Sequence, residues 1–199
     1  MEVHAILAFM LYAFVSSITP GPNNLMVLSS GLNFGLRATL PHLFGIELGF
    51  MFMLLLVGLG LGQIFSLWPA LYDVLKYLGA AYLLYLAYQI AQAGALGQTQ
   101  QSSKPMGFWS AAVFQWVNPK AWIMAIGTFS AYVPTRQGVG VILFSVLLFG
   151  LLGFPSVGAW AMFGAHLRRY LQQEFYLRWF NRIMAGLLVL SLYPILWSR

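Results

Sequence analysis

The chain carries no Lys, Arg, Asp or Glu from Val3 to Leu36. This run is longer than the roughly 20 apolar residues that an α-helix needs to cross a bilayer. Hydrophobic residues make up 60% of the 199 residues and charged residues only 7%, whereas about a quarter of a soluble domain is charged. We therefore predict an integral membrane protein with a single domain, 1–199. Its net charge of +6 is attributed to orientation in the bilayer, and nucleic acid is not expected as a partner.

Charged residues divide the chain into long apolar runs, which predict six transmembrane helices. The predicted spans are at about 6–31, 39–64, 71–92, 108–132, 139–164 and 180–196. The longest polar stretch, AQAGALGQTQQSSKP, is rich in Gly, Gln and Ser, and it predicts a flexible linker at 93–107. The predicted fold is an all-α membrane protein with two three-helix repeats, about 1–92 and 108–199.

The first helix of each half is interrupted near its middle. TPGPNN, from Thr19 to Asn24, falls in the first span, and WVNPKAW falls in the fourth. Proline has no N–H and breaks the helical ladder, so the freed backbone groups have to be buried or line a polar cavity. Because each half has three spans, the second half is inverted relative to the first. Broken helices at matching positions of inverted repeats are typical of secondary transporters; a plain proline kink is the alternative for either break alone.

The residues at the two breaks are the predicted substrate-binding residues. Asparagine side chains offer both donors and acceptors, and the N-termini of half-helices carry a partial positive charge that suits a carboxylate. The predicted residues are Pro20, Gly21, Pro22, Asn23, Asn24, Asn118, Pro119 and Lys120.

Two charged side chains lie well inside predicted spans, where a charge costs roughly 2.5–3.5 kcal/mol on insertion scales and faces the protein interior. We expect Lys120 to contact a substrate carboxylate; the alternative is that it pairs with freed carbonyls or with Glu47. Glu47 is expected either to bind a substrate ammonium or carry a proton, or to form a structural ion pair. His42 is the second proton-coupling candidate, and its alternative is a satisfied histidine near the cytoplasmic end of its helix.

Other patterns concern packing and chemistry. Gly45 and Gly49 are four residues apart, a small-xxx-small spacing that predicts close helix packing. The sequence has no cysteine, no HExxH motif, no Ser-His-Asp set and no Walker loop. It therefore predicts no catalytic residue, no metal, no cofactor and no direct coupling to ATP.

The distribution of Lys and Arg predicts the orientation. The loops after odd-numbered spans carry six of these residues, Arg37, Lys104, Arg168, Arg169, Arg178 and Arg182. The opposite side carries three, Lys76, Arg136 and Arg199. The loops after odd-numbered spans are therefore expected in the cytoplasm and both termini in the periplasm. The segment 166–182 mixes Arg with aromatic residues, which predicts an interfacial connector, with an ordinary polar loop as the alternative.

The two interrupted segments also carry a family resemblance. TPGPNNLMVLSSGLNFGLR and FQWVNPKAWIMA resemble the two signatures of the lysine exporter superfamily, LysE/RhtB, and KYLGAAYLLYLAYQIA resembles its third span. The similarity covers nearly the whole chain and is greatest to the cysteine and O-acetylserine exporter subgroup. The resemblance implies secondary-active efflux of amino acids or small derivatives across the bacterial inner membrane, driven by the proton motive force in antiport.

One position departs from the family pattern. Many members have Asp after Pro-Gly-Pro, whereas this chain has Asn23. The difference leaves no acid there to carry a proton, and it favours a neutral substrate, such as cysteine, O-acetylserine, threonine or homoserine, over a dibasic one.

Two alternatives stay open, a membrane scaffold or assembly subunit without transport, and an exporter of basic amino acids. An enzyme is not expected, because no nucleophile or metal constellation is found. The expected partners are a small-molecule amino-acid substrate and membrane lipid, and assembly into a homo-oligomer is left open.

Overall fold

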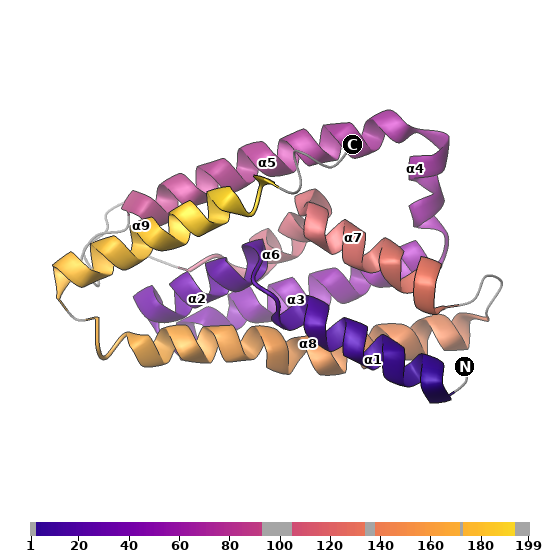
Figure 1. Ribbon diagram of the computed structural model, residues 1–199, viewed down its shortest axis with the longest axis horizontal. Helices are drawn as coiled ribbons and strands as arrows, with labels where there is room; N and C mark the ends of the chain where they lie inside the picture. The colour runs from indigo at the N-terminus through magenta and orange to yellow at the C-terminus, as the bar shows by residue number, and fades with distance from the viewer. Residues whose placement is uncertain (1–2, 93–104, 134–137, 172, 194–199) are drawn as a thin grey trace.

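The computed structural model describes residues 3–92, 105–133, 138–171 and 173–193. Every regular element in these ranges is helical (Figure 1), which confirms the all-α prediction. The α-helices are α1 (Val3–Ile18), α2 (Pro22–Phe34), α3 (Leu36–Gly58), α4 (Ile64–Leu67), α5 (Pro69–Gln92), α6 (Phe108–Phe114), α7 (Pro119–Gly127), α8 (Val139–Leu167) and α9 (Glu174–Leu190). Short 3-10 turns form η1 (Leu61–Gln63) and η2 (Gln115–Val117), and η3 (Thr128–Tyr132) is π-helical. Most of the predicted linker lies outside the described residues.

Three of these helices, α3, α5 and α8, are long and apolar enough to cross a membrane. The pair α1 and α2 meets the same criterion when taken together, and its two axes differ by 52°. The second interrupted segment consists of shorter pieces, and α9 has 17 residues. The fold is thus that of a multi-pass membrane protein, while the number of six spans stays a prediction.

The broken segments lie inside the helical assembly. In Figure 1, α8 runs along one side of the molecule beneath α1 and α2, and α5 and α9 lie together on the opposite side. One cluster of buried apolar side chains joins α2, α5, α6 and α9, with Leu83 and Leu188 fully buried. A second joins α1, α3, α7 and α8 around Met53 and Phe149. These clusters hold the two breaks between the long helices.

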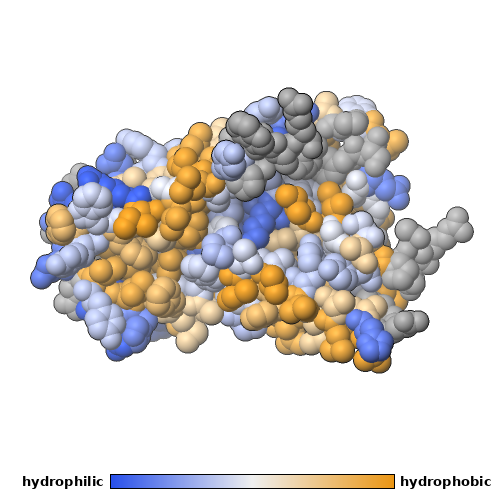
Figure 2. All heavy atoms as spheres, viewed as in Figure 1, coloured by the Kyte–Doolittle hydropathy of each residue, from blue (hydrophilic) through white to orange (hydrophobic). Residues whose placement is uncertain are grey.

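The outer surface is strongly apolar. Figure 2 shows broad hydrophobic areas across the visible face. On α8, Leu147 and Leu151 are 63% and 69% exposed, whereas Val146 and Phe149 are buried against the other helices. Large exposed apolar areas are rare on soluble monomers and suit contact with lipid chains.

The last helix begins earlier than the sequence predicted. The expected start was at about 180, but α9 begins at Glu174, whose carboxylate bonds to Arg178 one turn later. Leu177 and Asn181 are buried, while Arg178 and Arg182 are exposed. This first part of α9 is amphipathic, so a search for continuous apolar residues missed it. Most of the predicted connector is therefore helix.

Two helix crossings depend on glycine. A Cβ atom at Gly164 of α8 would lie 2.1 Å from the carbonyl oxygen of Leu28 in α2. On α3, a Cβ at Gly45 would lie 2.3 Å from the Phe108 carbonyl oxygen, and one at Gly49 would lie 2.6 Å from Cα of Ala112. The absence of a side chain lets these backbones approach more closely than any other residue would allow.

Candidate functional site

The first break separates α1 from α2. Pro20 is exposed, and Gly21 is extended, with φ −172° and ψ 179°. Pro22 is the first residue of α2, a position where its missing N–H removes no helical hydrogen bond. The chain therefore ends one helix and starts another within three residues, at the place that the sequence predicts.

The break leaves carbonyls at the end of α1 and just beyond it without helical partners, and side chains of α2 and α8 bond to them. The Asn24 Nδ2 donates to the carbonyl oxygens of Ser17 and Thr19, each at 2.8 Å. The Trp160 Nε1 of α8 donates to the Ile18 carbonyl at 3.0 Å. Because an unpaired carbonyl cannot be left in lipid, these bonds explain how the backbone can open inside a membrane protein.

The second break separates η2 from α7. Asn118 is extended, with φ −88° and ψ 106°, and its Oδ1 accepts a hydrogen bond from the Lys120 backbone N–H at 3.2 Å. Pro119 is the first residue of α7. On the other side of the break, the Trp122 Nε1 donates to the Trp116 carbonyl at 2.9 Å. Asn118 is thus an N-cap, and α7 starts from it with its amide groups directed toward the break.

Lys120 connects the two breaks. Its Nζ donates to the Thr19 carbonyl oxygen at 2.8 Å, across 101 positions of sequence. A Cβ at Gly21 would lie 2.8 Å from the Lys120 Cδ and 2.9 Å from its Nζ, so the glycine makes room for this side chain. Of the two alternative partners expected for Lys120, the freed carbonyl is found. No ion pair joins Lys120 to Glu47 in the described part of the chain.

A pair of amides makes a second connection between the breaks. The Asn23 Nδ2 donates to the Gln115 Oε1 at 2.8 Å, and the Gln115 Nε2 donates back to the Asn23 Oδ1 at 3.2 Å. Gln115 is fully buried, and its Nε2 also donates to the Ala111 carbonyl at 2.9 Å. The start of α2 is therefore fixed against the end of α6.

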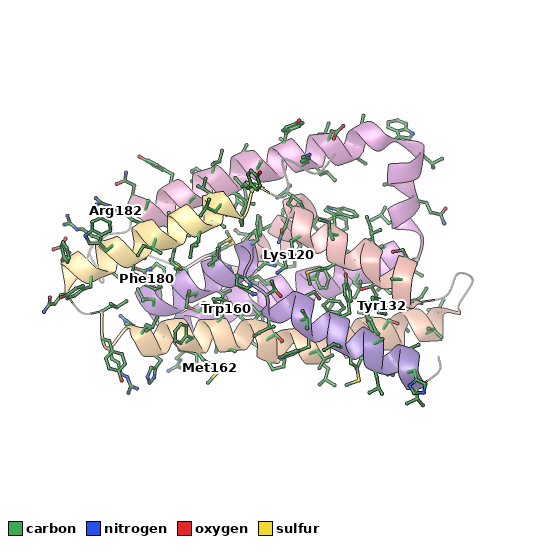
Figure 3. All side chains as sticks on the ribbon, in the orientation of Figure 1. Lys120, Tyr132, Trp160, Met162, Phe180 and Arg182 are labelled. Atoms are coloured by element: carbon green, nitrogen blue, oxygen red, sulfur yellow. The ribbon has the colours of Figure 1, made fainter. Side chains whose placement is uncertain are left out.

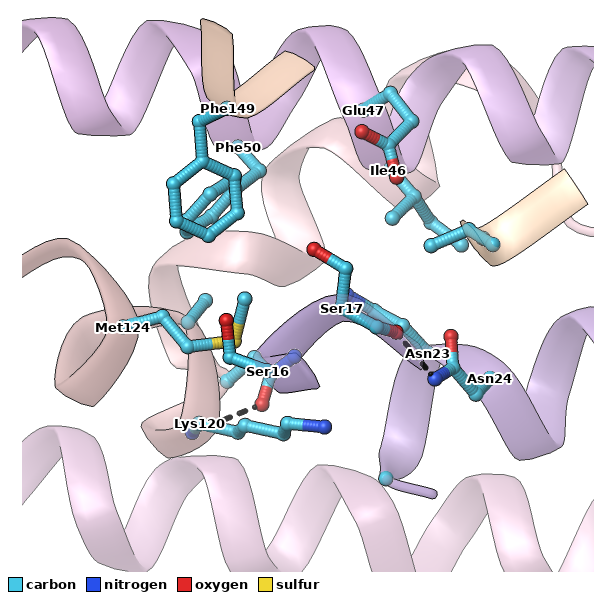
Figure 4. Close-up of a pocket in the computed structure, with 14 residues that line it drawn as sticks. Ser16, Ser17, Asn23, Asn24, Ile46, Glu47, Phe50, Lys120, Met124 and Phe149 are labelled. Carbon is cyan, nitrogen blue, oxygen red and sulfur yellow. Dashed lines mark hydrogen bonds between the residues drawn. The ribbon is translucent and has the colours of Figure 1, made fainter. Parts of the chain in front are cut away.

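A pocket lies between the two breaks (Figure 4). Its empty volume is about 420 Å³, including space open to solvent. The lining residues are Ser16, Ser17, Gly21, Asn23, Asn24, Ile46, Glu47, Phe50, Asn118, Lys120, Ala121, Met124, Phe149 and Val157. Figure 3 places Lys120 and Trp160 near the middle of the helical assembly, away from its two ends.

The pocket gathers most of the residues predicted from the breaks, namely Gly21, Asn23, Asn24, Asn118 and Lys120. Pro20 and Pro22 do not line it and act on the backbone instead. Pro119 lines a second, smaller hollow beside Lys76 of α5.

Glu47 also lines the pocket, although it comes from the unbroken helix α3. Its side chain is 4% exposed, and a Cβ at Gly153 of α8 would lie 2.5 Å from its Oε2. Within the described residues, Glu47 takes part in no hydrogen bond or ion pair. The alternative of a structural ion pair therefore finds no partner among them.

His42 lies on α3 outside the pocket lining. It is 2% exposed, and neither ring nitrogen has a hydrogen-bond partner among the described residues. The alternative of a satisfied interfacial histidine is not what the structure shows. The described residues also contain no group of three or more His, Asp or Glu side chains that could hold a metal ion.

Several pocket residues were missed by sequence reasoning. Ser16, Ser17 and Phe149 line the pocket, while Gln115 and Trp160 support the breaks from outside it. Gln115 had a usable signal, because it is an isolated amide in an apolar span three residues before Asn118. Phe149 and Trp160 had none, because aromatic residues are common throughout the apolar runs.

Comparisons with known proteins agree on one family. The family model described as LysE type translocator matches residues 14–193. The cysteine/O-acetylserine efflux protein of Salmonella typhimurium strain LT2 is 36% identical over 186 residues, and that of Klebsiella pneumoniae subsp. pneumoniae is 36% identical over 184. The protein of that name from Escherichia coli K12 is 34% identical over 186 residues. Each alignment covers 92% of both chains. No solved structure gives a significant match.

Proposed function

Because this chain belongs to the LysE type translocator family, we propose that it exports small neutral amino acids, such as cysteine, O-acetylserine, threonine or homoserine, in exchange for protons. The family and its matched relatives are described as translocators and efflux proteins. This agrees with the prediction that the chain is not an enzyme, and amino-acid efflux is its general activity. The substrate and the proton coupling are the proposed parts.

The observation that carries the proposal is that two helix N-termini and one lysine meet at a single pocket. The starts of α2 and α7, at Gly21 and Asn118, both line it, and so does Lys120. Each helix start directs backbone N–H groups and a partial positive charge outward. A substrate carboxylate can therefore replace the Thr19 carbonyl as the acceptor for the Lys120 ammonium, and charge-assisted bonds of this kind are the stronger ones.

Glu47 supplies the opposite charge. Figure 4 draws Glu47 and Lys120 on opposite sides of the pocket, with Ser16 and Ser17 between them. A substrate ammonium and a proton compete for the same carboxylate, so binding of one displaces the other. This competition is a simple basis for antiport. His42, one turn before Ile46 on the same helix, is the second candidate for carrying protons to this site.

The packing of the helices supports two inverted repeats. In the first half, α2 packs on α8, and in the second half α6 packs on α3. Each broken segment thus packs on the second helix of the other half. The third helices of the two halves, α5 and α9, pack on each other. The helix contacts made by the first half are thus matched by equivalent contacts of the second half. This is expected for six spans with repeats about 1–92 and 108–199.

One contact supports the proposed orientation of the protein in the membrane. A Cβ at Gly35, between α2 and α3, would lie 2.8 Å from the Arg168 Nη1 at the end of α8. The loops after the predicted first and fifth spans therefore lie at the same end, and Arg37 belongs to it by sequence. We place this end in the cytoplasm and both termini in the periplasm, with the protein in the bacterial inner membrane. Lys104, Arg136 and Arg199 lie outside the described residues.

Flux across a lipid bilayer tests the proposal. The purified protein is placed in proteoliposomes, a pH gradient is imposed, and labelled cysteine, O-acetylserine, threonine, leucine, lysine and arginine are followed. We expect gradient-dependent flux of the small neutral members. Lys120→Ala is expected to abolish it while the protein still inserts and folds, because the carboxylate loses its cation.

Three results would contradict the proposal. Flux of lysine and arginine alone would favour an exporter of basic amino acids. Flux of no member by folded protein would favour a scaffold or assembly subunit. Normal flux through Lys120→Ala would remove Lys120 from the site.

A further inference from the structure

The pocket has one wall with no charged group. Phe50 of α3, Phe149 of α8 and Met124 of α7 lie together on it, on the side away from Asn23 and Asn24 (Figure 4). The Phe50 and Phe149 rings are 5.0 Å apart at an interplanar angle of 59°. This aromatic wall, defined by Phe50, Phe149 and Met124, is distinct from the polar groups that suit the two charged ends of an amino acid.

Residues that do not line the pocket pack against the aromatic wall. The Phe149 ring lies 6.1 Å from the Phe9 ring and makes an edge contact with the Tyr12 ring at 6.4 Å. Tyr12 in turn donates to the Met124 carbonyl at 3.1 Å and stacks on Tyr132 at 4.8 Å. Because close-packed cores resist local displacement, a turn of the Phe149 ring would disturb its contacts with α1 and α3. The wall therefore has a fixed position.

One free hydroxyl lines the same pocket as this wall. Ser17 is 6% exposed and lines the pocket. Its hydroxyl makes no hydrogen bond with any of the described residues, whereas the neighbouring Ser16 hydroxyl donates to the Tyr12 carbonyl at 2.6 Å. A hydroxyl can both donate and accept, so Ser17 is available for one polar atom of a ligand.

We propose that the aromatic wall and Ser17 form the subsite for the substrate side chain, which selects narrow, uncharged side chains with at most one polar group. This inference rests on the proposed function and adds its selectivity. A branched or aromatic apolar side chain would overlap the Phe149 ring, and overpacking of a rigid site is unfavourable. A lysine or arginine side chain would lose hydration against the wall without gaining a counter-charge. A hydroxyl, a thiol or a short ester can bond to Ser17.

A size series tests the subsite in proteoliposomes. Flux of labelled O-acetylserine is measured against unlabelled alanine, valine, leucine, phenylalanine and lysine. With the unaltered protein, we expect competition to weaken steadily from alanine to phenylalanine and to be weakest for lysine. Equal competition by alanine and phenylalanine would overturn the inference, even if no variant could be prepared.

Variants then test whether Phe149 limits the size of the substrate side chain. Phe149→Ala is expected to improve competition by leucine, relative to alanine, by at least about tenfold, since each methylene in an apolar pocket changes discrimination by roughly 10- to 200-fold. Phe154→Ala is the matched control, because Phe154 lies on the same helix, contacts Phe44 and does not line the pocket. If Phe149→Ala does not fold, Phe149→Leu is the milder variant, with a smaller shift in the same direction.

The outcomes separate this inference from the proposed function. No flux of any amino acid through the unaltered protein would contradict the proposed function itself. Flux that persists in Phe149→Ala or Phe149→Leu with the same leucine-to-alanine ratio as Phe154→Ala would overturn only the side-chain subsite.

Discussion

The side-chain amides of Asn23 and Gln115 bond to each other in both directions, at 2.8 Å and 3.2 Å. They lie 92 positions apart, one at the start of α2 and the other just before the second break. Because both amides use a donor and an acceptor in the pair, the relative position of the two breaks is fixed by direct bonds. The shape of the pocket between the breaks depends on this pair and on the hydrogen bond from Lys120 to the Thr19 carbonyl.

Gln115→Leu should destabilise the protein and weaken substrate binding. Leucine fills a similar volume but leaves the half-buried Asn23 amide without its partner, and the cost should not exceed the roughly 1–3 kcal/mol of a fully buried group. Thermal unfolding in detergent measures the loss, and the apparent affinity of flux measures the effect on the site. A double variant with Asn23→Ala should lose little more than Gln115→Leu alone. Fully additive losses would show that the two amides act independently.

Gly21→Ala should weaken substrate binding with little effect on stability. The added methyl meets the flexible end of Lys120, which can move away at small cost but then leaves its position at the break. Loss of a charge-assisted bond worth about 1.5–3 kcal/mol corresponds to a roughly ten- to hundredfold lower affinity. The concentration dependence of flux provides the measurement. Gly107→Ala is the control, because nothing lies within 4 Å of a Cβ there; equal affinities in the two variants would refute the expectation.

Gly164→Ala should destabilise the crossing of α8 with α2. Its Cβ would lie 2.1 Å from a backbone oxygen, that of Leu28, which cannot turn aside as a side chain can. Overpacking of this kind typically costs about 1–3 kcal/mol, to be read from thermal unfolding. Gly140→Ala on the same helix meets nothing within 4 Å and should leave the unfolding temperature unchanged. An unchanged temperature in both variants would mean that the crossing relaxes freely.

Glu47→Gln should retain substrate exchange but lose its coupling to protons. Glutamine keeps the shape of the side chain and can accept a hydrogen bond, but it can neither bind nor release a proton. We expect exchange of labelled for unlabelled O-acetylserine to persist at a lower apparent affinity, because the amide accepts a hydrogen bond from the substrate ammonium but supplies no counter-charge. Accumulation driven by a pH gradient is expected to be lost. Glu174→Gln, at an exposed residue of α9, is the control and should retain both activities. Gradient-driven accumulation in Glu47→Gln at the level of the control would exclude Glu47 from coupling.

The breaks could be predicted from the sequence because their cause is local. Pro22 and Pro119 each start a new helix, and this follows from the missing N–H of proline rather than from any distant contact. That the two breaks lie close together was inferred only from their matching positions in the two halves of the chain. The residues that hold them together, such as Gln115 and Trp160, are brought there by packing between distant segments, which no local pattern encodes.

Where the structure differs from the sequence-based predictions, the differences also have physical causes. The start of α9 was placed too late because its first turns bury one face and expose arginines on the other, so its apolar character is periodic rather than continuous. A satisfied histidine near an interface was the alternative for His42, yet both of its ring nitrogens are buried without a partner among the described residues. Burial depth depends on the neighbouring helices and cannot be obtained from the flanking residues.

Occupancy of the pocket can be measured directly, because the chain has no cysteine of its own. Ser16→Cys places one thiol in the pocket lining, and Gly107→Cys places one at an exposed position with open space around it. The rate of maleimide labelling is followed at each position with and without O-acetylserine. If an amino acid binds between the two breaks, O-acetylserine slows labelling at position 16 and leaves position 107 unaffected. Equal labelling rates at position 16 with and without O-acetylserine, in protein that transports it, would show that the substrate binds elsewhere.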